Sequence, residues 1–160
     1  MLAKLQKTDQ GYLAQFNRNL NHPVEDVWAM LTDNDKLAQW FPELRVKDLR
    51  EGGAFTFNMG EGNLIEMPIL EFKMHSELEF TWADDVVRFE LHPEAEGCQL
   101  ILKEKINKMT DHTPRDLAGW HVCLDVISAL LDRKTIENRK AEWEKWYPKY
   151  VEAVDEITQS

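Results

Sequence analysis

Two side chains with the chemistry of metal ligands lie one helical turn apart in this chain. His121 and Asp125 are four residues apart, a spacing that places both side chains on one face of a helix. An imidazole and a carboxylate make half of a metal site, but no third or fourth ligand follows at a recognisable spacing, and neither an HExxH nor a paired CxxC motif occurs. The sequence therefore predicts no metal site.

No nucleophile in the sequence is paired with a base. There is no GxSxG motif, and Cys123 lies two residues from His121, so that on a helix the two side chains point apart. The glycines at 52–53 and 60–62 are placed as in hairpin turns and not as in a phosphate-binding loop before a helix. We predict no catalytic residue and no cofactor.

Composition and charge restrict the partners of the protein. The 160 residues carry a formal net charge of −10, with Lys and Arg scattered among the acids, which argues against nucleic-acid and anionic-membrane binding. No window approaches the ~20 apolar residues of a membrane span. Residues 1–11 lack the apolar core of a signal peptide, and we expect Cys98 and Cys123 to be buried, reduced thiols. These features favour a cytoplasmic protein.

A long amphipathic helix over Pro114–Leu131 is the element around which the rest is organised. Its apolar residues recur at helical spacing and need a large apolar partner surface. That surface is predicted upstream, in segments of period two separated by Gly, Asn and Asp turns, which is typical of an antiparallel sheet. Two short helices follow the first of these strands, and an amphipathic tail helix is predicted over 140–157, with a kink or restart at Pro148.

Several segments, in this order, resemble one superfamily. They are the His22–Asp33 and Leu37–Phe41 segments after the first strand, the Ile69–Phe72 and Leu78–Trp82 strands, the pair Gly119-Trp120 with Leu124 and Ile127, and the tail aromatics Trp143, Tyr147 and Tyr150. Together they resemble the SRPBCC (START-like) superfamily, and within it the branch related to the activator of the heat-shock-protein-ninety ATPase.

The resemblance implies an α+β helix-grip fold. We expect a mainly antiparallel, curved sheet of about seven strands wrapped around the long C-terminal helix, with two short helices after strand one. Residues 1–160 would form a single domain of this kind. The fold implies a cavity between sheet and helix that often takes hydrophobic small molecules.

If that cavity is open, apolar side chains from the sheet, the second short helix and the long helix would line it. The predicted ligand-binding residues are Trp40, Phe41, Phe55, Phe57, Phe80, Trp82, Phe89, Leu100, Leu102, Trp120, Leu124 and Ile127. Aromatic stripes of this kind also fill ordinary cores, because protein interiors pack densely. Both interpretations stay open at the level of sequence.

Four polar residues are candidates for the cavity wall. Arg18 lies on the inward face of strand one, where a guanidinium needs a partner or access to solvent. The fold implies that strand one lies beside strand seven, which makes Glu104 its predicted partner, with Glu66 as a second inward acid. His121 is the histidine we expect nearest the pocket.

Three functions are compatible with these observations. The first is a protein that binds a small hydrophobic or aromatic molecule, lipid-like or polyketide-like. The second is a protein-partner module resembling a co-chaperone domain. The third is an enzyme of the cyclase or aromatase type, which would need an acid or base such as Glu66, Glu104, His75 or His121. A non-enzymatic role is favoured, because no such group forms a recognisable motif.

Overall fold

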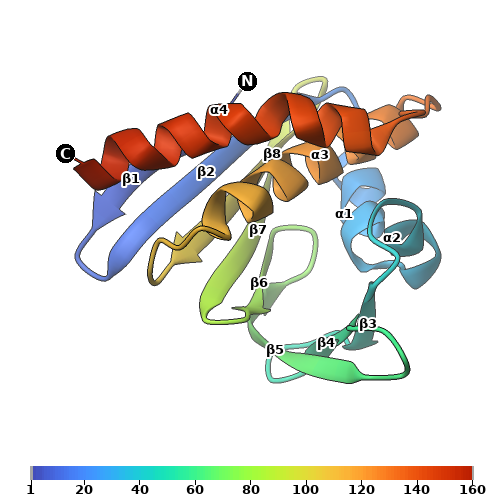
Figure 1. The fold of residues 1–160 in the computed structure, drawn as a ribbon. Helices are drawn as coiled ribbons and strands as arrows, with labels where there is room; N and C mark the ends of the chain where they lie inside the picture. The colour runs from blue at the N-terminus through green and yellow to red at the C-terminus, as the bar shows by residue number, and fades with distance from the viewer. Residues whose placement is uncertain (1, 160) are drawn as a thin grey trace.

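A single antiparallel sheet wrapped around a long helix is the centre of the molecule. The computed structural model describes residues 2–159, in which eight strands are ordered β1-β2-β8-β7-β6-β5-β4-β3 (Figure 1). The strands are β1 Lys4–Thr8, β2 Gly11–Leu20, β3 Leu44–Asp48, β4 Ala54–Asn58, β5 Leu64–Lys73, β6 Glu77–Trp82, β7 Asp85–Glu94 and β8 Gly97–Ile106. The helices are α1 Val24–Thr32, α2 Asn34–Trp40, α3 Thr113–Leu131 and α4 Arg139–Gln159.

This architecture confirms the predicted helix-grip fold, with one strand more than expected. The extra strand, β1, pairs antiparallel with β2 at the edge of the sheet. Its sequence, KLQKT, is mostly exposed and lacks the apolar alternation by which strands are recognised. Pairing with β2 through the backbone therefore defines β1, and its side chains do not reveal it.

The apolar core lies between the concave face of the sheet and α3. Alternate residues of β2 and β8, among them Phe16 and Leu102, are paired across the two strands and fully buried. From α3, residues such as Leu117, Leu124 and Ile127 meet them. Burial at helical spacing on α3 and at a spacing of two on the strands produces one continuous core.

The β3–β5 end of the sheet is bent relative to the rest. The β5–β6 register shifts between Ile69 and Glu71, next to Pro68, which lacks a backbone N–H for the ladder. In Figure 1 these strands curl away below α3, and α1 and α2 lie beside the open end. The bend leaves room for large side chains between α3 and β4.

The tail helix α4 lies across the outside of α3. It extends over Arg139–Gln159 and contains Pro148 in its interior, so the helix does not restart there. Tyr150 and Val154 are its buried residues, and Figure 1 shows the helix running along α3 and over β1 and β2. Within residues 2–159, none of the helices is long and apolar enough to cross a membrane.

Candidate functional site

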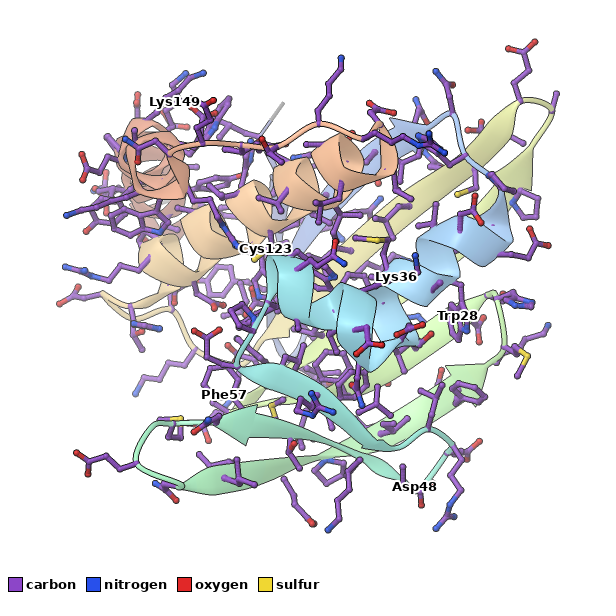
Figure 2. All side chains as sticks on the ribbon, turned by 90° about the vertical axis from the view of Figure 1, so that its right-hand side faces the viewer. Trp28, Lys36, Asp48, Phe57, Cys123 and Lys149 are labelled. Atoms are coloured by element: carbon purple, nitrogen blue, oxygen red, sulfur yellow. The ribbon has the colours of Figure 1, made fainter. Side chains whose placement is uncertain are left out.

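A continuous aromatic cluster fills the space between α3 and the bent end of the sheet. Phe55 stacks on Phe80 with ring centroids 4.6 Å apart, Phe80 is followed by Phe89, and Phe89 meets Trp120 edge-on at 6.0 Å. In Figure 2, Cys123 is labelled on α3 and Phe57 on β4, with side chains filling the space between these two elements. Ring contacts of this kind stabilise the core beyond the area they bury.

The structure divides the twelve predicted ligand-binding residues into two groups. Most of them are at most 2% exposed and belong to the core: Trp40, Phe55, Phe80, Phe89, Leu100, Leu102, Trp120, Leu124 and Ile127. The other three, Phe41, Phe57 and Trp82, are half-buried and contact one another. These three form an aromatic rim at the edge of the core.

A cleft of about 530 Å³ opens beside this rim. It lies between α3, the first turns of α4 and the ends of α2 and β6. Its lining residues are Phe41, Trp82, His112, Arg115, Asp116, Gly119, Trp120, Val122, Cys123, Arg139, Lys140 and Trp143. Only Phe41, Trp82 and Trp120 of these were predicted, because the others face the cleft through the packing of α4 on α3.

The cleft follows one face of α3. Its lining residues from His112, which directly precedes α3, to Cys123 recur at spacings of three or four positions, which is the spacing of one helical face. Gly119 is one of these residues, and a Cβ added there would meet no atom within 4 Å apart from its own helix backbone and its chain neighbours. A glycine inside a helix lowers its stability, so Gly119 marks a notch on the cleft floor. A helical glycine with no turn to make was the one sequence signal for it.

One wall of the cleft carries positive charge. Nη2 of Arg139 donates to the backbone carbonyl of Trp40 at 3.0 Å and lies 3.7 Å from Sγ of Cys123. Lys140 is exposed beside it, and the Arg115 guanidinium lies 5.4 Å from the centroid of the Tyr147 ring. Burial raises the pKa of the Cys123 thiol to about 12, against the opposing effect of Arg139, so this sulfur is a neutral thiol at physiological pH.

The single carboxylate that lines the cleft is already engaged. Oδ1 of Asp116 accepts a hydrogen bond from Nε1 of Trp82 at 3.0 Å. Behind it, the carboxyl group of Glu104 is 1% exposed and lies beside Asp116. Burial, and secondly the neighbouring Asp116, raise the pKa of Glu104 well above its usual range, which favours the protonated acid. Glu104 does face inward as predicted, but it does not line the cleft.

The predicted partner of Arg18 is wrong. Arg18 is paired with Leu100 across the β2–β8 ladder, whereas Glu104 lies opposite Ala14, four residues away along each strand. Nε of Arg18 instead lies 3.9 Å from Oδ1 of Asp125 on α3, and Nη1 donates to the carbonyl of Asn17. Strand alternation gave the correct face of β2 but could not give the position at which α3 crosses it.

Glu66 also differs from its predicted orientation. Met67 and Ile69 on β5 are buried, which turns the side chain of Glu66 to the outer face. There its side chain is 56% exposed and forms an ion pair with Lys47. Glu66 therefore does not contribute to a wall between the sheet and α3.

His121 lies in a separate, closed cluster between α3, α4 and β2. Its Nδ1 is 2.7 Å from the Tyr150 hydroxyl, which accepts from the backbone N–H of Ala3 at 3.0 Å. Its Nε2 is 3.6 Å from Oδ2 of Asp125. In the neutral tautomer that directs Nε2–H at Asp125, Nδ1 accepts the proton of the Tyr150 hydroxyl. The cluster ties the N-terminal segment, α3 and α4 together without reaching the cleft.

Among residues 2–159, the remaining candidate groups are not gathered into a metal-binding cluster. No set of three or more His, Cys, Asp or Glu side chains within residues 2–159 is placed to hold a metal ion. His75 lies in the turn between β5 and β6 and is exposed, with its ring against Trp28. Cys98 and Cys123 are both free and buried, as predicted.

The sequence matches one protein family over most of its length. Residues 21–132 match the family described as Activator of Hsp90 ATPase homolog 1-like protein. This segment begins just after β2 and ends just after α3, so it includes the α3 side of the cleft. Among curated proteins, none matches this sequence.

Solved structures with the same fold extend the similarity to the whole chain. EF2215 from Enterococcus faecalis, a conserved protein of unknown function, is 23% identical with a TM-score of 0.85, over 97% of this chain and 91% of that one. CalU16 from Micromonospora echinospora is 21% identical with a TM-score of 0.69, over 99% and 96%. DynU16, of the dynemicin biosynthetic locus, is 19% identical with a TM-score of 0.64, over 78% and 48%. At these identities the likeness shows a shared fold.

Proposed function

Because the chain belongs to the Activator of Hsp90 ATPase homolog 1-like family, which confirms the predicted resemblance but fixes no ligand, we propose a function from the cleft itself. The protein binds a small hydrophobic or aromatic molecule between α3, the start of α4 and the aromatic rim. One observation carries this proposal: the cleft is walled by aromatic side chains and has a floor that Gly119 leaves open.

The size and lining of the cleft support a small-molecule ligand. A volume of about 530 Å³ falls within the range of about 300–1,000 Å³ that is typical of ligand pockets. The rings of Phe41, Trp82, Trp120 and Trp143 offer flat apolar surface. Removing roughly 200 Å² of apolar ligand surface from water contributes roughly 5 kcal/mol, of which the ordering of ligand and side chains removes a part.

Substitution of Gly119 tests the proposal directly. Gly119→Leu places a side chain into the open space of the cleft floor, while the helix gains a better helix former. The matched control is Gly119→Ala, which changes the backbone propensity in the same direction but fills little of the cleft. Wild type and both variants are screened by thermal shift against naphthalenes, flavonoids, polyketide-like aromatics, fatty acids and sterols, and the hits are titrated by calorimetry.

We expect a hit that stabilises the wild type by mass action. Gly119→Leu should weaken its binding at least tenfold, and Gly119→Ala should stay within about threefold of the wild type. A ligand whose affinity is the same in all three proteins binds elsewhere, and the proposal is then wrong. No stabilising compound in any class would also count against it.

Binding of a protein partner is the alternative function, and exposed apolar residues favour it. Met59, Leu64 and Ile65 surround the β4–β5 turn with 57%, 59% and 45% of their surface exposed. Clustered exposed apolar side chains are typical of interaction surfaces. This alternative gains support if every compound class fails in the screen.

Domain organisation and location complete the proposal. Residues 1–160 act as one helix-grip domain, supported by the packing of α4 on α3 and of Tyr150 against Ala3. The two free thiols suit a reducing compartment, so a cytoplasmic location is part of the proposal. Cell fractionation tests it.

A further inference from the structure

We propose that the molecule bound in the cleft carries one acidic group, which Arg139 holds while the aromatic rim holds an apolar, planar body. This inference rests on the proposed function and names the ligand class: an aromatic carboxylic acid. The contacts of Arg139 and the charge balance of the cleft support it.

Arg139 is fixed in place but only partly used. Nη2 is anchored by the Trp40 carbonyl and the Cys123 sulfur, which holds the half-buried guanidinium against the cleft wall. Nη1 and Nε of Arg139 have no hydrogen-bond partner among residues 2–159. A guanidinium presents five N–H donors in a rigid fork that suits a carboxylate. A pre-positioned guanidinium with free donors is therefore suited to an anionic ligand.

The charges around the cleft are unbalanced. Arg115, Arg139 and Lys140 line it, and none forms an ion pair with a carboxylate of residues 2–159. The only acid in the lining, Asp116, accepts from Trp82, and the neighbouring Cys123 is held as a neutral thiol. In a chain with a net charge of −10, three unpaired cations at one cleft attract an anion.

A pair of matched probes tests the inference. We would titrate the protein with 2-naphthoic acid and with 2-naphthamide by calorimetry at neutral pH, at low and at high ionic strength. The two compounds share the naphthalene body and differ in the charge of one group. The acid should bind the wild type about tenfold or more tightly than the amide, and added salt should reduce this ratio.

Arg139→Gln should reduce the ratio to near one while leaving the affinity for 2-naphthamide unchanged. Lys140→Gln removes an exposed charge, should fold normally, and should reduce the ratio two- to threefold. The matched control is Lys134→Gln, which removes the same charge from the exposed connection before α4 and should leave the ratio unchanged.

The outcomes separate this inference from the proposed function. Equal affinity of the wild type for acid and amide, both lost in Gly119→Leu, would overturn the acidic ligand and leave the binding function standing. A preference for the acid that persists in both Arg139→Gln and Lys140→Gln would also overturn it. If neither compound binds the wild type, both the inference and the binding function for aromatic ligands fail.

Discussion

Two polar regions flank α3 beneath α4, and they differ in whether their charged and polar side chains have partners. In the first, Arg18, His121, Asp125 and Tyr150 face one another between α3, α4 and β2. In the second, Arg115, Arg139 and Lys140 line an open cleft without an ion pair within residues 2–159. We refer to them below as the closed cluster and the cleft.

The closed cluster keeps two of its titratable groups, His121 and Tyr150, neutral. Burial, and secondly the charge of Arg18, lower the pKa of His121 to about 3. Burial raises the pKa of Tyr150 to about 12. Both groups are therefore uncharged near pH 7, with their polar atoms directed at each other. The comparison teaches that a strongly shifted pKa beside a carboxylate such as Asp125 need not mark a functional site. Unpaired donors that line open space are the more specific sign.

The largest effect that would sharpen the comparison of the closed cluster with the cleft is the contribution of His121 to the pH dependence of the free energy of unfolding. Between its unfolded pKa near 6.5 and its folded pKa of about 3, the unfolded chain binds a proton that the folded chain does not. The free energy of unfolding should therefore be fully retained above about pH 6.5. As the pH falls through this window, it should decrease by a few kcal/mol, in order of magnitude.

His121→Gln isolates that contribution, because glutamine binds no proton in this range. In urea unfolding from pH 7 to pH 4, the gap in unfolding free energy between wild type and variant should narrow as the pH falls. The groups that face the ring, Arg18, Asp125, Lys145, Lys149 and Tyr150, are present in both proteins. A gap that stays constant with pH would show that His121 is not held neutral by the fold.

The next effect concerns the hydroxyl at the centre of the closed cluster. Tyr150→Phe removes the acceptor of the Ala3 N–H and the donor to Nδ1 of His121. It should lower the free energy of unfolding by about 1–3 kcal/mol, as measured with urea, and leave 2-naphthoic acid binding unchanged. Tyr147→Phe is the matched control on the same helix: Tyr147 is half-buried and contributes its ring to stacking on Trp143. Equal losses in the two variants would mean that the hydroxyl bonds do not carry the stability.

The fold was predictable because its main elements have local signals. The expected helix over 114–131 and the observed α3, Thr113–Leu131, agree since apolar spacing and Pro114 define the helix without help from its neighbours. The strand β1 has no such signal, and pairing with β2 alone defines it. Periodicity therefore predicts elements that bury their own side chains and misses those held by backbone pairing at an edge.

Of the residues that line the cleft, the sequence predicted only apolar ones. The pattern named Phe41, Trp82 and Trp120, which the structure places in the cleft lining. It could not name Arg139 and Lys140, because their position depends on how α4 crosses α3. The Arg18–Glu104 pairing failed for a similar reason: alternation fixes the face of a residue, whereas its partner depends on where a helix passes over the sheet.

The smallest predicted effect tests whether Gly119 keeps the cleft open although alanine at this position would make the protein more stable. Gly119 has helical backbone geometry with no left-handed φ and no neighbour to clash with a Cβ, so Gly119→Ala should raise the free energy of unfolding by about 0.5–1 kcal/mol. Ser128→Ala, a half-buried position on the same helix away from the cleft, should raise it by a smaller amount through propensity alone.

The informative comparison is with Gly119→Leu. If leucine also leaves stability equal or higher but abolishes ligand binding, glycine is the less stable and the functional choice at this position. If Gly119→Leu instead destabilises the protein, the notch is needed for the packing of α4 on α3, and the cleft loses its main support as a binding site. Urea unfolding of the two variants and the wild type distinguishes these outcomes before any ligand is known. It measures only whether the open space beside α3 lowers the free energy of unfolding.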